Sequence, residues 1–407
     1  MSDKLASVRE IPYSEVEGYL PPVEPFDWDG EFPDVLICAL GFEDRTRAIV
    51  GRLAQTVDPS KSKHPLAVYC EYQTNNEDNA ANRGPLLALL NVAYERSVSV
   101  TADDPASLRA RMLDELSQVA TSSAKPISVM VDISAAAGSL ILTLCAVLTE
   151  FSATHRMRLR VAYAEAGSYE PSKDAYEVNG EQLVLKACSS GDASSLHEFG
   201  VAEVEINELY PGSPQEGREE LIIALPAYRT ERLSRCLRRV SSEPILPIGD
   251  HVHWILGEPP ANELAFRLEF QKRVITRLLV GESEAVSSGK ALTSENMSVT
   301  STLHYQQTTR RIVEIVDAHL GHTLSLVHMG SKMQGLGAGL ALAVRSEVTV
   351  CYARPTRFNP KLYSCGIGPM WQVDFSDFGV VVDMLRTVGR LQMTTAVETV
   401  RSGLPAQ

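Results

Sequence analysis

One pattern of residues occurs twice in this chain, in the same order and at nearly the same spacing. Each copy starts with an apolar run followed by Arg-Thr, continues with a Gly-Ser that opens a second apolar segment, and ends with Tyr-Ala followed by an aromatic residue and a proline. The anchors of the first copy are 35–40, Arg45-Thr46, Gly138-Ser139, Tyr163-Ala164, Tyr169 and Pro171, and those of the second are 221–225, Arg229-Thr230, Gly330-Ser331, Tyr352-Ala353, Phe358 and Pro360. Self-similarity at a fixed spacing is typical of repeated domains. The sequence therefore predicts a tandem duplication of one α/β unit.

Within each copy, short apolar runs alternate with longer segments of helical periodicity. The predicted strands are 35–40, 66–72, 98–101, 127–133 and 159–164 in the first copy and 221–225, 252–256, 297–303, 323–327 and 348–353 in the second. The predicted helices are 45–53, 85–94, 105–119 and 138–151, then 229–240, 262–279, 305–320 and 331–344. This alternation is typical of a parallel sheet covered on both faces, and right-handed crossovers then give two tandem doubly wound, Rossmann-like units. The predicted boundaries are an N-terminal extension at 1–30, the first unit at 31–206, a linker at 207–217 and the second unit at 218–407.

The size and composition of the chain fit two globular domains. Its 407 residues exceed what one core usually supports, and 44% hydrophobic with 22% charged residues is a globular balance. A formal net charge of −13 argues against direct DNA binding, because phosphate binding needs clustered Lys and Arg. The seven cysteines include no CxxC pair, which indicates reduced thiols. Since no apolar stretch reaches the ~18 residues of a membrane span, we expect a cytoplasmic protein without membrane contact.

The topology places candidate ligand-binding residues in the loops after the first and fourth strands of each copy, where the strand order reverses. In the second copy, Gly330, Ser331 and Lys332 lie at a helix start, where amides, a hydroxyl and an ammonium favour an anion. Arg354 and Arg357 follow the adjacent strand and add guanidinium groups suited to phosphate. The first-strand and fourth-strand loops contribute four further candidates, Arg45, Arg229, Asp132 and Ser134.

Helix capping is the alternative interpretation of these residues. Ser331 and Asp132 are both residue types that cap helices, and Lys332 beside such a cap is then a solvated charge. The first copy has Leu140 where the second has Lys332. We therefore expect the first copy to contact a less charged part of any ligand.

Two other motifs do not indicate a cofactor or a metal. Gly335, Gly337 and Gly339 lie inside a predicted helix rather than before it, which favours close packing on the sheet over a dinucleotide cradle. His251 and His253 alternate on a strand at a spacing that zinc can use, but no third ligand lies nearby in the sequence. We expect no cofactor and no metal.

The segment 326–333 ends a strand in Gly330-Ser331-Lys332 and leads into a helix rich in small residues. It resembles the ligand loop of CRISPR-associated Rossmann fold (CARF) domains, in which a strand ends in a Gly-Thr-Lys-type turn. The segment 131–134 is similar to the strand end of the same motif but lacks the lysine. CARF domains sense cyclic oligonucleotide second messengers as symmetric pairs. The resemblance implies a fused pair of such units in which Ser331 and Lys332 contact the ligand.

Three functional classes follow from the pattern and the resemblance. The first is a tandem sensor that binds a nucleotide-type anionic ligand and acts with a separate protein effector; the resemblance alone suggests an antiviral defence system as the setting. The second is an enzyme that hydrolyses or transfers a nucleotide or nucleoside, with Glu43, Asp44 or Asp132 as the acid or base. The third is a non-catalytic scaffold subunit. The sequence does not discriminate among them and assigns no catalytic residue.

Overall fold

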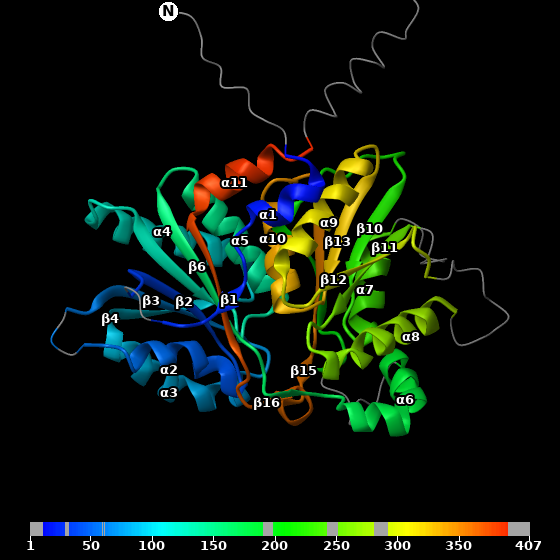
Figure 1. Cartoon of the computed structure of the whole chain (residues 1–407), viewed down its shortest axis with the longest axis horizontal. Coiled ribbons are helices and arrows are strands. Elements are labelled where there is room, and N and C mark those ends of the chain that lie inside the picture. Colours follow the sequence, from blue (N-terminus) through cyan, green and yellow to red (C-terminus); the bar gives the residue numbers. More distant parts are fainter. Residues whose placement is uncertain are drawn as a thin grey trace, which may run out of the picture.

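The computed structural model describes residues 11–28, 32–58, 60, 62–189, 198–241, 251–280 and 292–389. The first ten residues of the predicted N-terminal extension therefore lie outside the described residues. Two sheets stand side by side with helices on their faces (Figure 1). The predicted α/β class with two Rossmann-like units is confirmed.

The two sheets share one strand order. The first contains β2 (Val35–Leu40), β3 (His64–Glu71), β4 (Tyr94–Thr101), β5 (Ile127–Asp132) and β6 (Met157–Ala164), and the second contains β10 (Glu220–Leu225), β11 (Val252–Glu258), β12 (Met297–Ser301), β13 (Thr323–His328) and β14 (Thr349–Arg354). These strands run parallel in the orders β6-β5-β2-β3-β4 and β14-β13-β10-β11-β12. Tyr163 and Tyr352 both lie in the fifth strand of their copy. The duplication read from the sequence therefore extends to the topology.

Helices fill three layers around the sheets. The first copy contributes α2 (Ala48–Ala54), α3 (Asn76–Ala93), α4 (Pro105–Ser122) and α5 (Gly138–Ser152), and the second contributes α7 (Thr230–Val240), α8 (Phe266–Val280), α9 (Tyr305–Ala318) and α10 (Lys332–Leu342). Alternate residues of β2 face opposite sides: Ile37 packs in a core shared by both copies, and Leu36 packs against α2 and α3. The shared core includes residues of α4, α5, α9 and α10, and Figure 1 shows α5 and α10 between the two sheets. The copies are therefore joined through a continuous apolar layer.

Each copy also contributes one strand to the sheet of the other. After β6 the chain passes through β7 (Ser168–Tyr169), α6 (Lys173–Cys188) and β8 (Glu198–Phe199) to β9 (Glu203–Pro211). After β14 it passes through β15 (Arg357–Phe358), η5 (Pro360–Leu362) and β16 (Ser364–Cys365) to β17 (Met370–Asp377). Strand β9 pairs antiparallel with β14 of the second sheet, and β17 pairs antiparallel with β6 of the first. Two short ribbons, β7 with β16 and β8 with β15, tie the crossing segments together. The predicted linker 207–217 begins inside β9.

Short elements complete the fold. They are η1 (Tyr13–Glu15), α1 (Val16–Tyr19), β1 (Glu24–Pro25), η2 (Asp44–Arg47), η3 (Asn262–Leu264) and α11 (Phe378–Arg386). Strand β1 pairs with β17, so part of the predicted N-terminal extension belongs to the first sheet. Among the described helices, none combines the length and the apolar character that crossing a bilayer requires.

Helix α3 begins nine residues before its predicted start and contains Pro85 in its interior. Its first half is polar, so no apolar periodicity reveals it in the sequence. Asn82 from this half is buried and donates to the Gly41 carbonyl over 2.8 Å. The unpredicted part of the helix thus fixes the loop after β2, which leads to Glu43 and Arg45.

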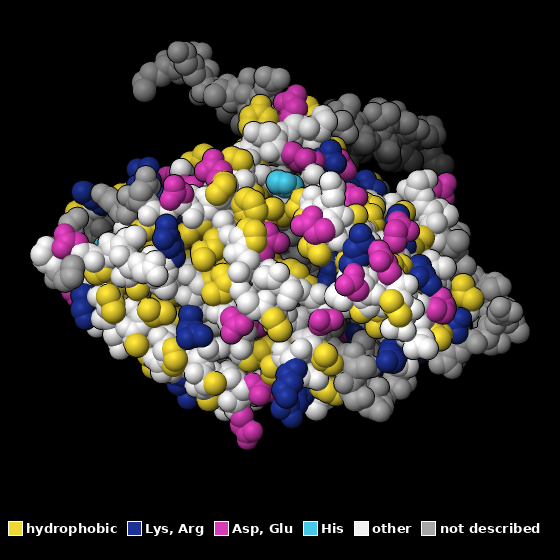
Figure 2. Space-filling model, turned by 60° about the horizontal axis from the view of Figure 1, so that its bottom comes forward, with side chains coloured by type: hydrophobic (Ala, Val, Ile, Leu, Met, Phe, Trp, Pro, Cys, Tyr) yellow, Lys and Arg dark blue, Asp and Glu magenta, His cyan; other side chains and the backbone are white. Residues whose placement is uncertain are grey.

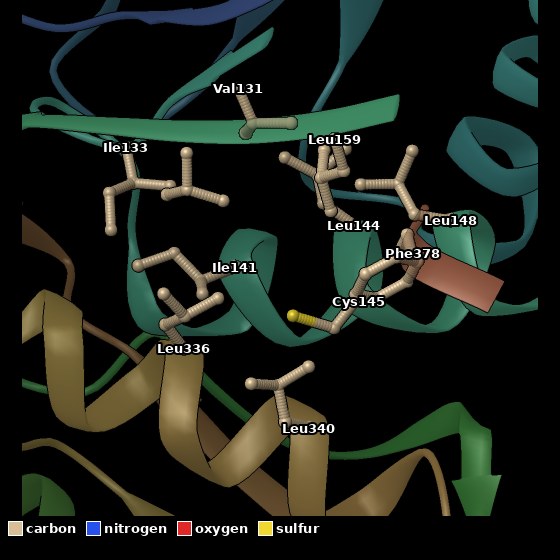
Figure 3. A pocket seen from close by; sticks show the side chains of 11 residues that line it. Val131, Ile133, Ile141, Leu144, Cys145, Leu148, Leu159, Leu336, Leu340 and Phe378 are labelled. Carbon is tan, nitrogen blue, oxygen red and sulfur yellow. The ribbon is translucent and has the colours of Figure 1, made fainter. Parts of the chain in front are cut away.

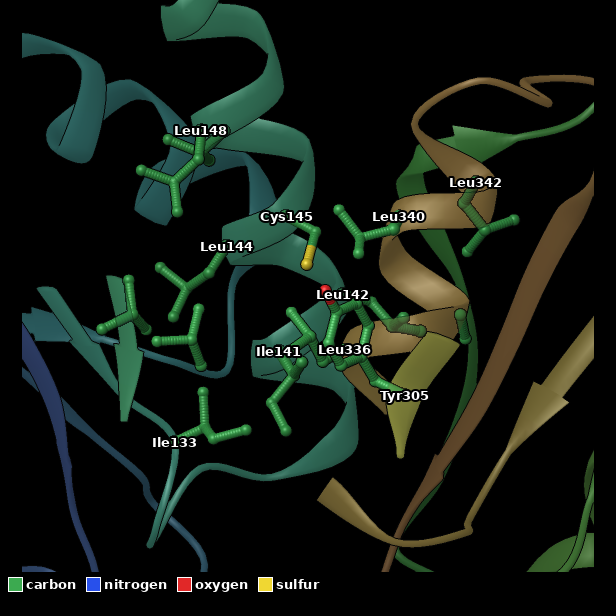
Figure 4. Close-up of a cluster of buried hydrophobic side chains, with 14 of the residues drawn as sticks. Ile133, Ile141, Leu142, Leu144, Cys145, Leu148, Tyr305, Leu336, Leu340 and Leu342 are labelled. Carbon is green, nitrogen blue, oxygen red and sulfur yellow. The ribbon is translucent and has the colours of Figure 1, made fainter. Parts of the chain in front are cut away.

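The glycines of α10 allow close packing, but mainly against helices rather than against the sheet as predicted. A Cβ at Gly337 would lie 2.4 Å from the Tyr305 carbonyl oxygen of α9, and one at Gly339 would lie 2.5 Å from Cys145 Sγ of α5. Figure 4 shows the apolar side chains of α5 and α10 meeting along this contact. The absence of a side chain at Gly339 lets α5 of the first copy approach α10 of the second, and its absence at Gly337 lets α9 and α10 pack closely within the second copy.

A small apolar cavity remains between α5, α10 and the first sheet (Figure 3). Its lining includes Ile141, Leu144, Cys145, Leu336 and Leu340. The cavity measures about 20 Å³, which is room for about one water molecule, and it offers no polar partner to hold one. It is too small for an organic ligand.

Candidate functional site

The carboxyl ends of β5 and β13 face each other across the contact between the copies. Lys332, the first residue of α10, extends into the first copy, where its Nζ donates to the Ala136 carbonyl over 2.8 Å. Its charge acts there on Glu43 and Asp132. The loops after β2, β5 and β13 therefore form one composite cluster, as the predicted reversal point requires.

Glu43 and Arg45 form the buried ion pair of this cluster. Arg45 Nε lies 2.9 Å from Glu43 Oε1, and both residues are less than a tenth exposed. Ser364, which the crossing segment brings from the second copy, donates to the same oxygen over 2.5 Å. Burial raises the pKa of Glu43, but Arg45, Lys332 and Ser364 outweigh it and hold this pKa below its usual value. Glu43 is therefore an ionised anchor rather than a poised acid.

Asp132 ends β5 and is almost completely buried. Its carboxylate accepts the Ser134 N–H over 2.9 Å and the Ser134 hydroxyl, while Ser134 Oγ accepts the Ala164 N–H over 2.8 Å. Burial raises the pKa of Asp132 to about 6, even though these donors and the nearby Arg45 and Lys332 lower it. Asp132 and Ser134 hold the loop and β6 rather than capping α5.

Lys332 is partly buried, so the interpretation of a solvated lysine is wrong. Burial and the charge of Arg45 together lower the pKa of Lys332 to about 8, against the opposing effects of Glu43 and Asp132. A lysine and a carboxyl group with pKa values displaced toward neutrality are typical of functional sites.

The two copies differ in the loop that precedes the helix. Five residues separate β5 from α5, and three separate β13 from α10. Gly138, the first residue of α5, is therefore the structural counterpart of Lys332, and the assignment of Leu140 to that position is wrong. The Gly-Ser anchors consequently lie at different points of their helix starts.

Ser331 caps α10, which confirms the capping interpretation for this residue. Its Oγ accepts the Gln334 N–H over 3.0 Å, and Gln334 Oε1 accepts the Ser331 N–H over 2.9 Å. The Ser331 hydroxyl also donates to the Thr302 carbonyl over 2.7 Å. Gly330 precedes it and lies against the side chain of Gln334. The Ser331 and Gln334 amides at the start of α10 thus already have partners within the protein.

The other three predicted cations are engaged elsewhere. Arg354 pairs with Glu203 and Glu205 of β9 and with Asp103, and Arg357 lies 3.5 Å from Asp78. Buried Arg229 donates over 2.7 Å both to Glu231 and to the Glu198 carbonyl. Arg229 and Arg354 tie the exchanged segments β8 and β9 to their surroundings, and Arg357 pairs with α3, so the structure does not add these guanidinium groups to the Lys332 cluster.

Sequence reasoning missed His328 and Ser364. His328 ends β13 as Asp132 ends β5, so an alignment of the copies at their strand ends would have found it. Ser364 reaches Glu43 only because the chain crosses between copies, and no local pattern reveals that. Burial lowers the pKa of His328 to about 4, so its ring is neutral near pH 7.

The ring of His253, one of the two alternating histidines, has its own protein neighbours. His253 Nε2 lies 3.1 Å from Ser298 Oγ and 3.4 Å from an Arg311 nitrogen. Within the described ranges, no group of three or more His, Cys, Asp or Glu side chains is arranged to hold a metal ion.

The surface and the comparisons add little to this cluster. Figure 2 turns the side of β15 and β16 toward the viewer and shows Lys and Arg side chains scattered among Asp and Glu rather than gathered in one basic patch. No protein-family model matches the chain, and a comparison with curated proteins gives no match. Functional inference therefore rests on the geometry of the cluster.

Proposed function

We propose that the chain binds a nucleotide-type anionic ligand where the carboxyl ends of the two sheets meet, and that it acts as a sensor with a separate protein effector. The observation that carries this proposal is the position of Lys332, which belongs to one copy and lies among Glu43, Arg45 and Asp132 of the other. A ligand bound beside Lys332 touches both copies. Binding can therefore change how they pack, which is what a sensor has to transmit.

The electrostatics of the cluster support an anion. Burial makes the Lys332 ammonium costly, and a phosphate group within hydrogen-bond reach would restore its favourable charge pairing. The resemblance of the Lys332 turn to CARF domains points to the same ligand class and suggests an antiviral defence system as the setting.

An enzyme acting on a nucleotide is the second candidate. It is favoured by the pKa of Asp132 near 6 and that of Lys332 near 8, since a general acid or base works best when its pKa is close to the ambient pH. Turnover of the bound ligand separates the two proposals.

The proposal is tested by native mass spectrometry of the gently purified chain, followed by identification of any released nucleotide and calorimetric titration with it. We expect Lys332→Met to weaken binding about ten- to a hundredfold, as for a charge-assisted contact. Lys125→Met is the matched control, because Lys125 is exposed in the loop before β5, at the opposite edge of the sheet. Equal affinities of the wild type and Lys332→Met would contradict the assignment.

A further inference from the structure

The starts of α5 and α10 lie close together but differ in how their backbone amides are used. The first amides of any α-helix lack partners within the helix. In α10 the Ser331–Gln334 capping box supplies partners for the amides of those two residues, whereas no side chain caps α5. The Ala137 N–H donates to the Tyr72 hydroxyl over 2.7 Å. The described residues supply no acceptor for the amides of Gly138, Ser139 and Leu140.

The start of α5 has the positive end of a 15-residue helix dipole. Gly138 and Ser139 are partly exposed. The Lys332 ammonium is held directly beside them by the carbonyl of Ala136. The nearby carboxylates are already satisfied, Glu43 by Arg45 and Asp132 by the two donors of Ser134.

A second, independent feature of this spot is the side chain of His328. The residue is 7% exposed, and neither ring nitrogen makes a hydrogen bond of normal geometry. The ring lies against the first residue of α5, because a Cβ at Gly138 would be 2.6 Å from His328 Nδ1. A Cβ at Gly335 would lie 2.9 Å from Cε1 of the same ring, so α10 confines it from the other side. Burying an imidazole whose nitrogens make no well-formed hydrogen bond is costly, and a ligand at this position would complete those bonds.

We propose that the start of α5 is the subsite for the anionic group of the ligand, a phosphate-type anion, with Lys332 and His328 completing it from the second copy. The amides of Gly138, Ser139 and Leu140 donate to the anion, the neutral His328 ring offers one N–H, and Lys332 supplies the positive charge. This inference rests on the proposed function and refines it, because it moves the anion from the helix that begins with Lys332 to the helix of the other copy.

Inorganic pyrophosphate is the probe, and amide chemical shifts in a transverse-relaxation-optimised spectrum of the deuterated full-length chain are the readout. We expect the largest shifts at Gly138, Ser139 and Leu140 and small ones at Met333 and Gln334. The inference is overturned if residues 138–140 do not shift, whether pyrophosphate binds elsewhere or not at all.

A charge variant provides a second measurement. Ser139→Asp places a carboxylate on the first turn of α5, which favours the helix and repels the anion. We expect its pyrophosphate affinity to fall about tenfold or more. Val380→Asp is the matched control, because Val380 is 63% exposed in the first turn of α11, which starts beside the beginning of β6 at the opposite edge of the sheet. Unchanged affinity in Ser139→Asp would overturn the subsite.

The two proposals fail in different ways. A nucleotide that is retained on purification while pyrophosphate leaves residues 138–140 unshifted removes the subsite and leaves the proposed function standing. Pyrophosphate bound at α5 in a chain that retains and binds no nucleotide removes the proposed ligand class and supports the subsite.

Discussion

Replacing Lys332 with methionine tests how the ammonium is held between the two copies. Its hydrogen bond to the Ala136 carbonyl stabilises the fold by about 1.5–3 kcal/mol, the range for a charged donor. Burial acts in the opposite direction, because it lowers the pKa of Lys332 from 10.5 to about 8. At about 1.4 kcal/mol per unit of pKa this is about 3 kcal/mol, which partial exposure of the side chain reduces to roughly 1–2 kcal/mol. The free energy of unfolding of Lys332→Met at pH 7 should therefore lie within about 2 kcal/mol of the wild type.

The direction of the pH dependence follows from the same shift. Between pH 8 and 10.5 the unfolded chain keeps the Lys332 proton and the folded chain has released it, so the stability of the wild type rises with pH through this window. Lys332→Met lacks that rise, and the difference between the two proteins should move in favour of the wild type from pH 7 to pH 10. Urea unfolding followed by circular dichroism measures both values. A loss of more than about 3 kcal/mol at pH 7, or parallel pH profiles, would refute the balance between burial and hydrogen bonding.

Two further predictions concern the packing of α9 against α10 within the second copy and the buried acid of the cluster. Gly337→Ala should lower the free energy of unfolding by about 2–3 kcal/mol, because the added Cβ would lie 2.4 Å from the Tyr305 carbonyl oxygen and force α9 from α10. Gly321→Ala, which meets no atom within 4 Å, is its control in the same urea titration, and equal losses in the two variants would contradict the packing argument. The pKa of Asp132 is about 6 in the folded chain and 3.8 in the unfolded chain, so the wild type loses stability as the pH rises from 3.8 to 6. Asp132→Asn should therefore be more stable than the wild type by about 2–3 kcal/mol at pH 7. The variant should lack this slope in unfolding experiments at pH 4 and pH 7, and a destabilised Asp132→Asn at pH 7 would show that the carboxylate charge is needed.

The parallel core of each copy could be predicted from the sequence because its strands are continuous apolar runs. β2 occupies the predicted residues 35–40, and β10 starts one residue before its predicted start. A buried parallel strand can be recognised from its own apolar run, without knowing which strands lie beside it. The exchanged strands lack this signal: most residues of β9 are exposed or half-buried, and β17 contains polar residues at alternate positions. Their pairing depends on the other copy, which local patterns do not encode.

The sequence predicts where the candidate site lies but not which residues form it. The reversal of strand order brought Asp132 and Lys332 to one edge, as topology requires. Loop length could not be judged from the Gly-Ser anchors, so Lys332 was aligned with Leu140 rather than with Gly138. The role of Arg354 was also hidden, because its carboxylate partners lie on β9, a strand that was not foreseen.

The exchange of β9 and β17 joins two copies in the way that a dimer with swapped strands joins two chains. In a homodimer, every residue near the symmetry axis occurs twice. Two copies of the second unit would place Lys332 opposite Lys332. Two copies of the first unit would bring Asp132 and Glu43 together without that lysine. Once both units belong to one chain, the sequence of each unit can change independently of the other. His328 can then stand where its counterpart is Asp132, and a ligand with two unlike ends can be held in a single orientation.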